Sequence, residues 1–125
     1  MAFKEHLEAV VGSVDGSVAC SVMGFDGIAV ETLQPDARAE DVAALDLQAA
    51  LVEYGNILGQ LKNTAQTLKT GAVAELSVNS EKVLTIMRMV NNDYFVVLAL
   101  LPDGNYGKGR YALRIAAPKL ARELA

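Results

Sequence analysis

The feature that most constrains the fold is an uninterrupted apolar run in the second half of the chain, Tyr94-Phe95-Val96-Val97-Leu98-Ala99-Leu100-Leu101. It lies between Asn91-Asn92-Asp93 and Pro102-Asp103-Gly104, and both of these flanking segments are typical of turns. Successive side chains of a strand alternate between the two faces of a sheet, so a strand of this composition needs apolar cover on both faces. The run therefore predicts a sheet with helices packed on each side.

Hydrophobic spacing predicts the other elements. Apolar residues at steps of three and four indicate helices, and β-branched or alternating stretches between turns indicate strands. The predicted elements are, in order, helix 3–14 ending at Gly16, strand 17–23, a turn at Gly24-Phe25-Asp26-Gly27, strand 28–32, loop 33–40, helix 41–69, strand 73–78, strand 83–90, strand 94–101 and a last helix after Gly107-Lys108-Gly109. A kink is expected in this last helix at Pro118, because proline removes a backbone hydrogen bond.

This order, α-β-β-α-β-β-β-α, predicts one α/β (α+β) domain over residues 1–125. The arrangement suits a profilin-like sandwich, in which a five-stranded antiparallel sheet has helices on both faces. A sheet of this kind is open, and strand 73–78 is polar enough on one side to lie at its edge.

The long helix carries a heptad-like apolar stripe and, on another face, two glycines. The stripe consists of Ala44, Leu47, Leu51, Tyr54, Leu58, Leu61, Ala65 and Leu68. A helix over 41–69 would be about 40 Å long, more than a small domain needs for its own core. Gly55 and Gly59 each cost up to about 1 kcal/mol in a helix interior. They either let the helix lie close on its own sheet or let a second backbone cross there.

Edge pairing between two copies would bring their long helices together, which predicts a symmetric homodimer. The residues expected at the dimer interface are Leu51, Tyr54, Gly55, Leu58, Gly59, Leu61, Ala65, Val73, Glu75, Leu76, Ser77 and Val78. Charge substitutions at Leu51 and Leu58 are then expected to give folded monomers.

Two groups of polar residues are candidates for a partner surface. The residues are Gln48, Glu53, Asn56, Gln60 and Asn63 on the long helix, and Lys108, Arg110 and Arg114 at the start of the last helix. The first group is mostly uncharged, as in many recognition surfaces. The second group is either a solvated helix end or a dock for an acidic partner.

Charge and cysteine content exclude several classes of protein. A net charge of −4 and a pI near 4.9 argue against binding to nucleic acid or to anionic lipid. The only cysteine, Cys20, lies in an apolar segment, which predicts burial and a reducing compartment. The N-terminal residues do not resemble a signal peptide and no apolar run is long enough to cross a membrane, so a cytoplasmic protein without membrane insertion is expected.

The sequence offers no catalytic or metal-binding constellation, and an enzyme is not expected. His6 is the only histidine and is predicted to be solvated near the N-terminus. The glycine-rich segment 104–109 lacks the glycine-to-lysine spacing and the Ser/Thr of a phosphate-binding loop. Neither a metal nor a cofactor is predicted.

Several segments together resemble the roadblock family. They are Val22-Met23-Gly24-Phe25-Asp26-Gly27-Ile28, the long helix, the apolar strand, and Gly107-Lys108-Gly109-Arg110-Tyr111-Ala112-Leu113-Arg114. The match spans nearly the whole chain and is similar to the bacterial branch of gliding-polarity proteins that includes MglB and MglC. The chain is expected to stand closer to MglC, because the acidic tail associated with MglB does not follow its last helix.

The resemblance implies a homodimeric adaptor with a shared ten-stranded sheet and no chemistry of its own. Its implied partners are a small Ras-like GTPase, another roadblock protein, or a polarity or motility factor that recruits it to a cell pole. The alternative is a sensor that binds a small ligand in a PAS-like sandwich. A sensor needs an internal cavity, which the dense Val, Leu, Ile and Met content of the strands disfavours.

Overall fold

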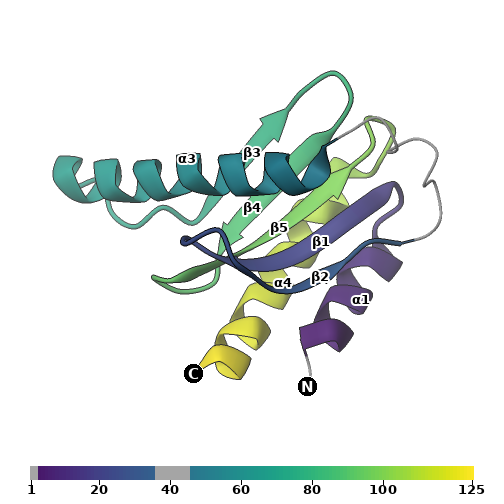
Figure 1. The fold of residues 1–125 in the computed structure, drawn as a ribbon, viewed down its shortest axis with the longest axis horizontal. Coiled ribbons are helices and arrows are strands. Elements are labelled where there is room, and N and C mark those ends of the chain that lie inside the picture. The colour runs from purple at the N-terminus through teal and green to yellow at the C-terminus, as the bar shows by residue number, and fades with distance from the viewer. Residues whose placement is uncertain (1–2, 36–45) are drawn as a thin grey trace.

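The computed structural model describes residues 3–35 and 46–125, which form a five-stranded antiparallel sheet in the order β2-β1-β5-β4-β3 (Figure 1). The elements are α1 (Phe3–Ser13), β1 (Ser17–Gly24), β2 (Ala29–Leu33), α3 (Leu47–Leu68), β3 (Glu75–Asn79), β4 (Leu84–Met89), β5 (Tyr94–Leu100) and α4 (Tyr106–Leu124). The predicted fold class and element order are confirmed. The predicted start of the long helix at residue 41, with Ala44, and most of the predicted loop 33–40 lie outside the described residues.

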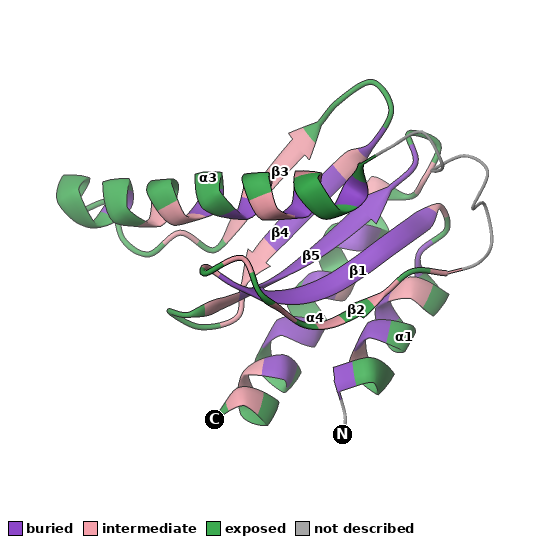
Figure 2. Cartoon of the chain, in the orientation of Figure 1, coloured by how far each residue is buried: buried purple, intermediate pink, exposed green. Residues whose placement is uncertain are grey.

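The sheet has helices on both faces: α1 and α4 cover one face and α3 covers the other (Figure 1). β5 is the central strand, and its side chains divide between the two layers. Val96, Leu98 and Leu100 pack with α1 and α4, whereas Phe95 and Val97 belong to the cluster under α3. Figure 2 shows β1 and β5 buried along most of their length. The prediction that the apolar run, now β5, is covered on both faces is confirmed.

The two long helices begin at side-chain caps. Asp46 accepts a hydrogen bond from the Ala49 N–H (3.1 Å) and starts α3, and Asn105 accepts one from the Lys108 N–H (3.1 Å) and starts α4. α3 ends at Lys69, which adopts the left-handed conformation at φ 59°. α4 continues past Pro118 to Leu124, so the proline at which we predicted a kink does not end the helix.

Candidate interaction surface

β3 lies at one edge of the sheet, as predicted, and the direction of its backbone groups follows from its pairing with β4. The Met89 N–H donates to the Ala74 carbonyl (3.0 Å), which makes Glu75 and Arg88 a non-hydrogen-bonded pair in the antiparallel ladder. Because the pattern alternates, Glu75, Ser77 and Asn79 direct their N–H and C=O groups away from β4. The edge therefore presents a row of backbone donors and acceptors.

Ser77 has a further unusual property on this edge. Its hydroxyl oxygen is buried and has no hydrogen-bond partner among the described residues. A buried polar group without a partner costs free energy, so it favours any arrangement that supplies one.

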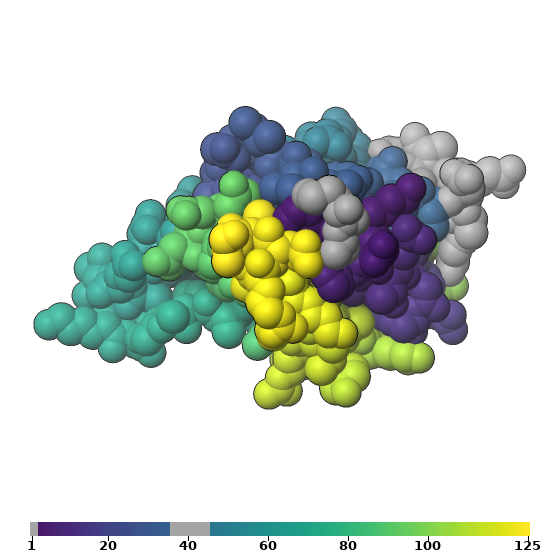
Figure 3. All heavy atoms as spheres, turned by 90° about the horizontal axis from the view of Figure 1, so that it is seen from below, coloured from purple at the N-terminus to yellow at the C-terminus, as the bar shows by residue number. Residues whose placement is uncertain are grey.

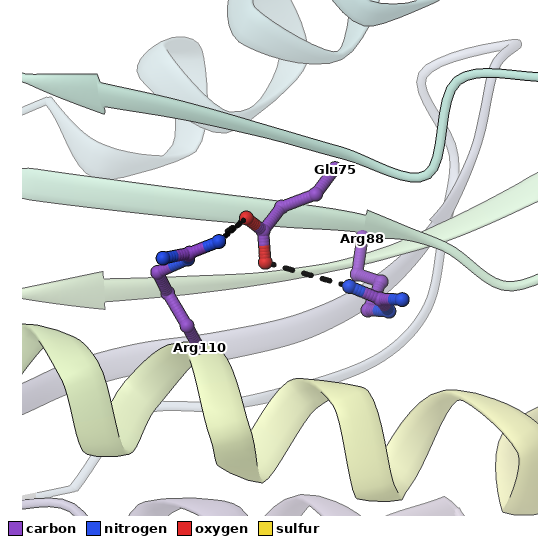
Figure 4. Close-up of polar contacts among 3 residues, drawn as sticks. All are labelled: Glu75, Arg88 and Arg110. Carbon is purple, nitrogen blue, oxygen red and sulfur yellow. Dashed lines mark hydrogen bonds and ion pairs between the residues drawn. The ribbon is translucent and has the colours of Figure 1, made fainter.

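A carboxylate ties this edge strand to α4 (Figure 4). Oε2 of Glu75 accepts a hydrogen bond from Nε of Arg110 (2.8 Å) and lies 2.7 Å from Nη2 of the same guanidinium, and Oε1 lies 3.5 Å from Nη1 of Arg88. The hydrogen bond from Arg110 to Glu75, together with the negative charge of Glu75, raises the pKa of the Arg110 guanidinium above its usual value. The Glu75 carboxylate is therefore already paired within its own chain, and only the backbone groups of Glu75 remain open at the edge.

The apolar stripe of α3 mostly faces the chain's own sheet. Leu51 is 3% exposed and Leu58 is fully buried, and both pack with Met23, Met87 and Phe95. Ala65 is also buried. The expectation that Leu51, Leu58 and Ala65 meet a partner is therefore corrected, because the core under α3 already covers their side chains. Charge at Leu51 or Leu58 would disrupt this core instead of giving a folded monomer.

The two glycines of α3 lie where the helix meets aromatic rings of its own chain. A Cβ built on buried Gly55 would stand 2.5 Å from Cζ of Phe95, and one on Gly59 would stand 3.3 Å from Cδ1 of Phe25. The two rings lie against each other with centroids 5.1 Å apart. Of the two explanations given for these glycines, the structure favours close packing on the chain's own sheet.

The part of α3 that remains open is narrower than the sequence suggested. Leu61 is 38% exposed and Leu68 is 65% exposed, and Tyr54 is half-buried beside the core. Ile57 is 44% exposed and lies off the heptad stripe, so the spacing of apolar residues does not identify it. The residues predicted for a polar partner surface are all exposed: Gln48, Glu53, Asn56, Gln60 and Asn63. Three half-buried residues at the sheet edge, Val73, Leu76 and Val78, pack against the core under α3.

The predicted basic group at the start of α4 is exposed but does not act as one unit. Arg110 is engaged by Glu75, whereas Lys108 lines a groove toward α1. A polar hollow of about 190 Å³ is lined by Glu75, Arg88, Gly107, Arg110, Tyr111 and Arg114.

The residues considered for catalysis have structural surroundings. Cys20 is buried in β1, as predicted, and burial raises the pKa of its thiol to about 12. His6 is half-buried with Nε2 3.9 Å from Oε1 of Glu123, which corrects the prediction that it is solvated. The segment 104–109 forms the cap and first turn of α4.

The described residues contain neither a candidate metal site nor a candidate membrane-spanning helix. Over 3–35 and 46–125, no group of three or more His, Cys, Asp or Glu side chains is arranged to hold a metal ion. In the same part of the chain, no helix combines the length and the apolar character needed to cross a bilayer.

Comparison with known structures shows similarity in sequence to MglC and similarity in fold to other roadblock proteins. The crystal structure of MglC from Myxococcus xanthus is 63% identical, with 98% of this chain and 99% of that chain covered and a TM-score of 0.70. The gliding protein MglB from Thermus thermophilus is 16% identical, with 98% and 89% covered and a TM-score of 0.81. A roadblock/LC7 domain from Streptomyces avermitilis is 9% identical, with 96% and 95% covered and a TM-score of 0.77.

No protein-family model and no curated protein matches the chain. The two relatives of low identity share the fold, whereas the identity with MglC extends over nearly the full length of both chains. The chain therefore belongs to the roadblock family, in the bacterial branch of MglB and MglC, and its sequence is more similar to that of MglC than to that of MglB.

Proposed function

We propose that this chain is a non-enzymatic, homodimeric adaptor of a bacterial polarity system. It binds another roadblock protein or a small Ras-like GTPase and acts in the cytoplasm, where partners recruit it to a cell pole. The observation that carries this proposal is the 63% identity with MglC over 98% of the chain. Identity of this extent includes the surface as well as the core, and surfaces determine partners.

The geometry of β3 supports the dimer. Its free edge and the exposed Leu61 of α3 offer a second copy both backbone hydrogen bonds and apolar contact. A dyad at Ser77 pairs Ser77 with the partner's Ser77 and Glu75 with the partner's Asn79, so that all outward backbone groups are satisfied. In this register the two orphan hydroxyls come within reach of each other.

The proposed dimer interface therefore consists of the β3 edge and the outer part of α3. Its residues are Tyr54, Ile57, Leu61, Val73, Glu75, Leu76, Ser77 and Val78. Gly59 is left out, because it faces Phe25 of its own chain. The exposed polar row from Gln48 to Asn63 remains for the GTPase or the second roadblock protein.

A proline at the edge separates pairing from folding. The Ser77 N–H points away from β4, so Ser77→Pro removes an edge donor and leaves the β3–β4 ladder intact. The Val78 N–H points toward β4, so the matched variant Val78→Pro breaks the ladder itself. Light scattering after size exclusion should give a dimer of twice 13.3 kDa for the wild type and a folded monomer for Ser77→Pro.

The same chromatography tests partners when the wild type is mixed with GTPases, loaded with GDP or a GTP analogue, and with roadblock proteins of the same genome. We expect a larger complex with at least one of them. If Ser77→Pro still forms a dimer, the interface is not at β3 and is assigned to β2, the other edge of the sheet. A protein that forms complexes with none of these partners would contradict the adaptor function.

A further inference from the structure

We propose that the groove between α1 and α4 is a docking site for an acidic amphipathic helix of a partner protein. Both helices lie on the face of the sheet opposite α3, where they run side by side (Figure 3). This surface is separate from the proposed dimer interface, and the inference does not depend on that interface.

The groove is a mostly apolar hollow between the two helices. It encloses about 200 Å³ and is lined at helical spacing by positions 6, 9, 10 and 13 of α1 and 108, 111, 112, 115, 116 and 119 of α4. Four of these residues are Ala or Ser, which keep the channel open. Beside them, Tyr111 is 64% exposed and Ile115 is 44% exposed, one turn apart on α4. Large apolar side chains in water beside a channel of small ones suit the apolar face of an incoming helix.

Charge determines which helix fits. Lys108 and Lys119 lie at the two ends of the α4 side of the groove, about 16 Å apart at 1.5 Å per residue, and no carboxylate lines it. Arg114 lines the neighbouring hollow, which shares Tyr111 with the groove, whereas Arg110 in that hollow is paired with Glu75. In total α4 carries five basic side chains and one carboxylate, in a chain whose net charge is −4. Such a concentration of positive charge selects an acidic partner.

An acidic helix fits these features better than an anionic membrane does. A helix of about three turns places carboxylates at both lysines while two apolar residues, three or four positions apart, contact Tyr111 and Ile115. A bilayer surface has no separate apolar ridge to enter the hollow between α1 and α4, whereas the apolar face of a helix does.

The test uses a phage-displayed library of helical peptides of about 15 residues, selected on the full-length protein. We expect enrichment of peptides with apolar residues at steps of three and four and carboxylates toward both ends. Affinities of the selected peptides are then measured by fluorescence anisotropy. Ile115→Glu should weaken peptide binding by about tenfold or more. Tyr111→Ser should have the same effect, and it replaces Ile115→Glu if that variant does not fold.

A matched control and a charge reversal make the test specific. Ile28, in the turn between β1 and β2, is 67% exposed and belongs neither to the groove nor to the proposed dimer interface, so Ile28→Glu should leave peptide affinity unchanged. The double variant Lys108→Glu/Lys119→Glu should lose the acidic peptide and gain affinity for a copy with lysines in place of its carboxylates.

Three results would overturn the proposal. The first is a selection without acidic amphipathic peptides, or with peptides that Ile115→Glu and Tyr111→Ser leave bound. The second is a higher oligomer in light scattering that Ile115→Glu dissociates, which would make the occupant a second copy of this chain. The third is sedimentation with phosphatidylglycerol vesicles that Ile115→Glu abolishes, which would make it a lipid surface.

Discussion

Gly55 of α3 lies directly against the ring of Phe95 on β5, so closely that a Cβ at position 55 would stand 2.5 Å from Cζ of the ring. The long helix can approach the centre of the sheet only because this position has no side chain. At this point glycine's cost in helix propensity is offset by the packing of a buried aromatic ring.

We therefore expect Gly55→Ala to destabilise the fold by about 1–3 kcal/mol, although alanine is the better helix former. The added methyl group must displace Phe95 or lift α3 from the sheet. Urea unfolding followed by circular dichroism measures the change in the free energy of unfolding.

Gly59→Ala is the matched control. Its Cβ would stand 3.3 Å from Phe25, a half-buried ring at the end of β1 that has room to shift. This variant should be between neutral and about 1 kcal/mol more stable than the wild type. Equal losses at both positions would contradict the packing explanation.

The corrected role of the α3 stripe leads to a second prediction. Leu58→Ala should lower the free energy of unfolding by about 2–5 kcal/mol, because Leu58 is fully buried under α3. Leu61→Ala, at a side chain 38% exposed, should cost less than about 1 kcal/mol and should instead weaken the dimer. Both are compared at the same protomer concentration, because dimerisation adds to apparent stability. A larger loss in the free energy of unfolding for Leu61→Ala than for Leu58→Ala would indicate that Leu58 lies at the interface and not in the core.

Much of the fold follows from local patterns in the sequence. The run Tyr94–Leu100 is apolar on both faces, which fixed it as a covered strand, and turns such as Gly24-Phe25-Asp26-Gly27 separate the strands. These features act over a few residues, so spacing and turn chemistry are enough to recognise them.

The surface was harder to predict, because spacing along a helix does not say what lies opposite. The stripe through Leu51 and Leu58 suits a coiled-coil partner and the chain's own sheet equally well. Exposed Ile57 lies off that stripe, and Glu75 meets Arg110 from 35 residues away. Such contacts depend on tertiary structure and leave no periodic trace.

The pKa of Cys20 predicts a pH dependence of stability. Burial raises the pKa of this thiol from 9.0 to about 12, so the folded chain keeps the proton at pH values where the unfolded chain loses it. The resulting stability is fully present below pH 9 and is lost as the pH rises toward 12. The slope is about 1.4 kcal/mol per pH unit within that range.

Urea unfolding between pH 8 and 11 measures this slope, with Cys20→Ala as the control for every other effect of pH on stability. The variant should lose less stability over the range than the wild type. Identical slopes would mean that the thiol ionises alike in the folded and unfolded chains.

The pair between Glu75 and Arg110 predicts how firmly the edge strand is held. Glu75→Gln keeps the shape of the side chain but removes the charge that compensates Arg110 and Arg88. Because charge-assisted hydrogen bonds are stronger than neutral ones, the amides of Leu76 and Val78, which face β4, should exchange with deuterium several-fold faster, while those of β5 stay unchanged. Glu53→Gln, at an exposed position of α3, should leave both strands as they are. High salt should narrow the difference between wild type and Glu75→Gln, since it screens the ion pair in the wild type alone. Unaltered exchange in Glu75→Gln would mean that the ladder with β4 holds β3 without help from α4.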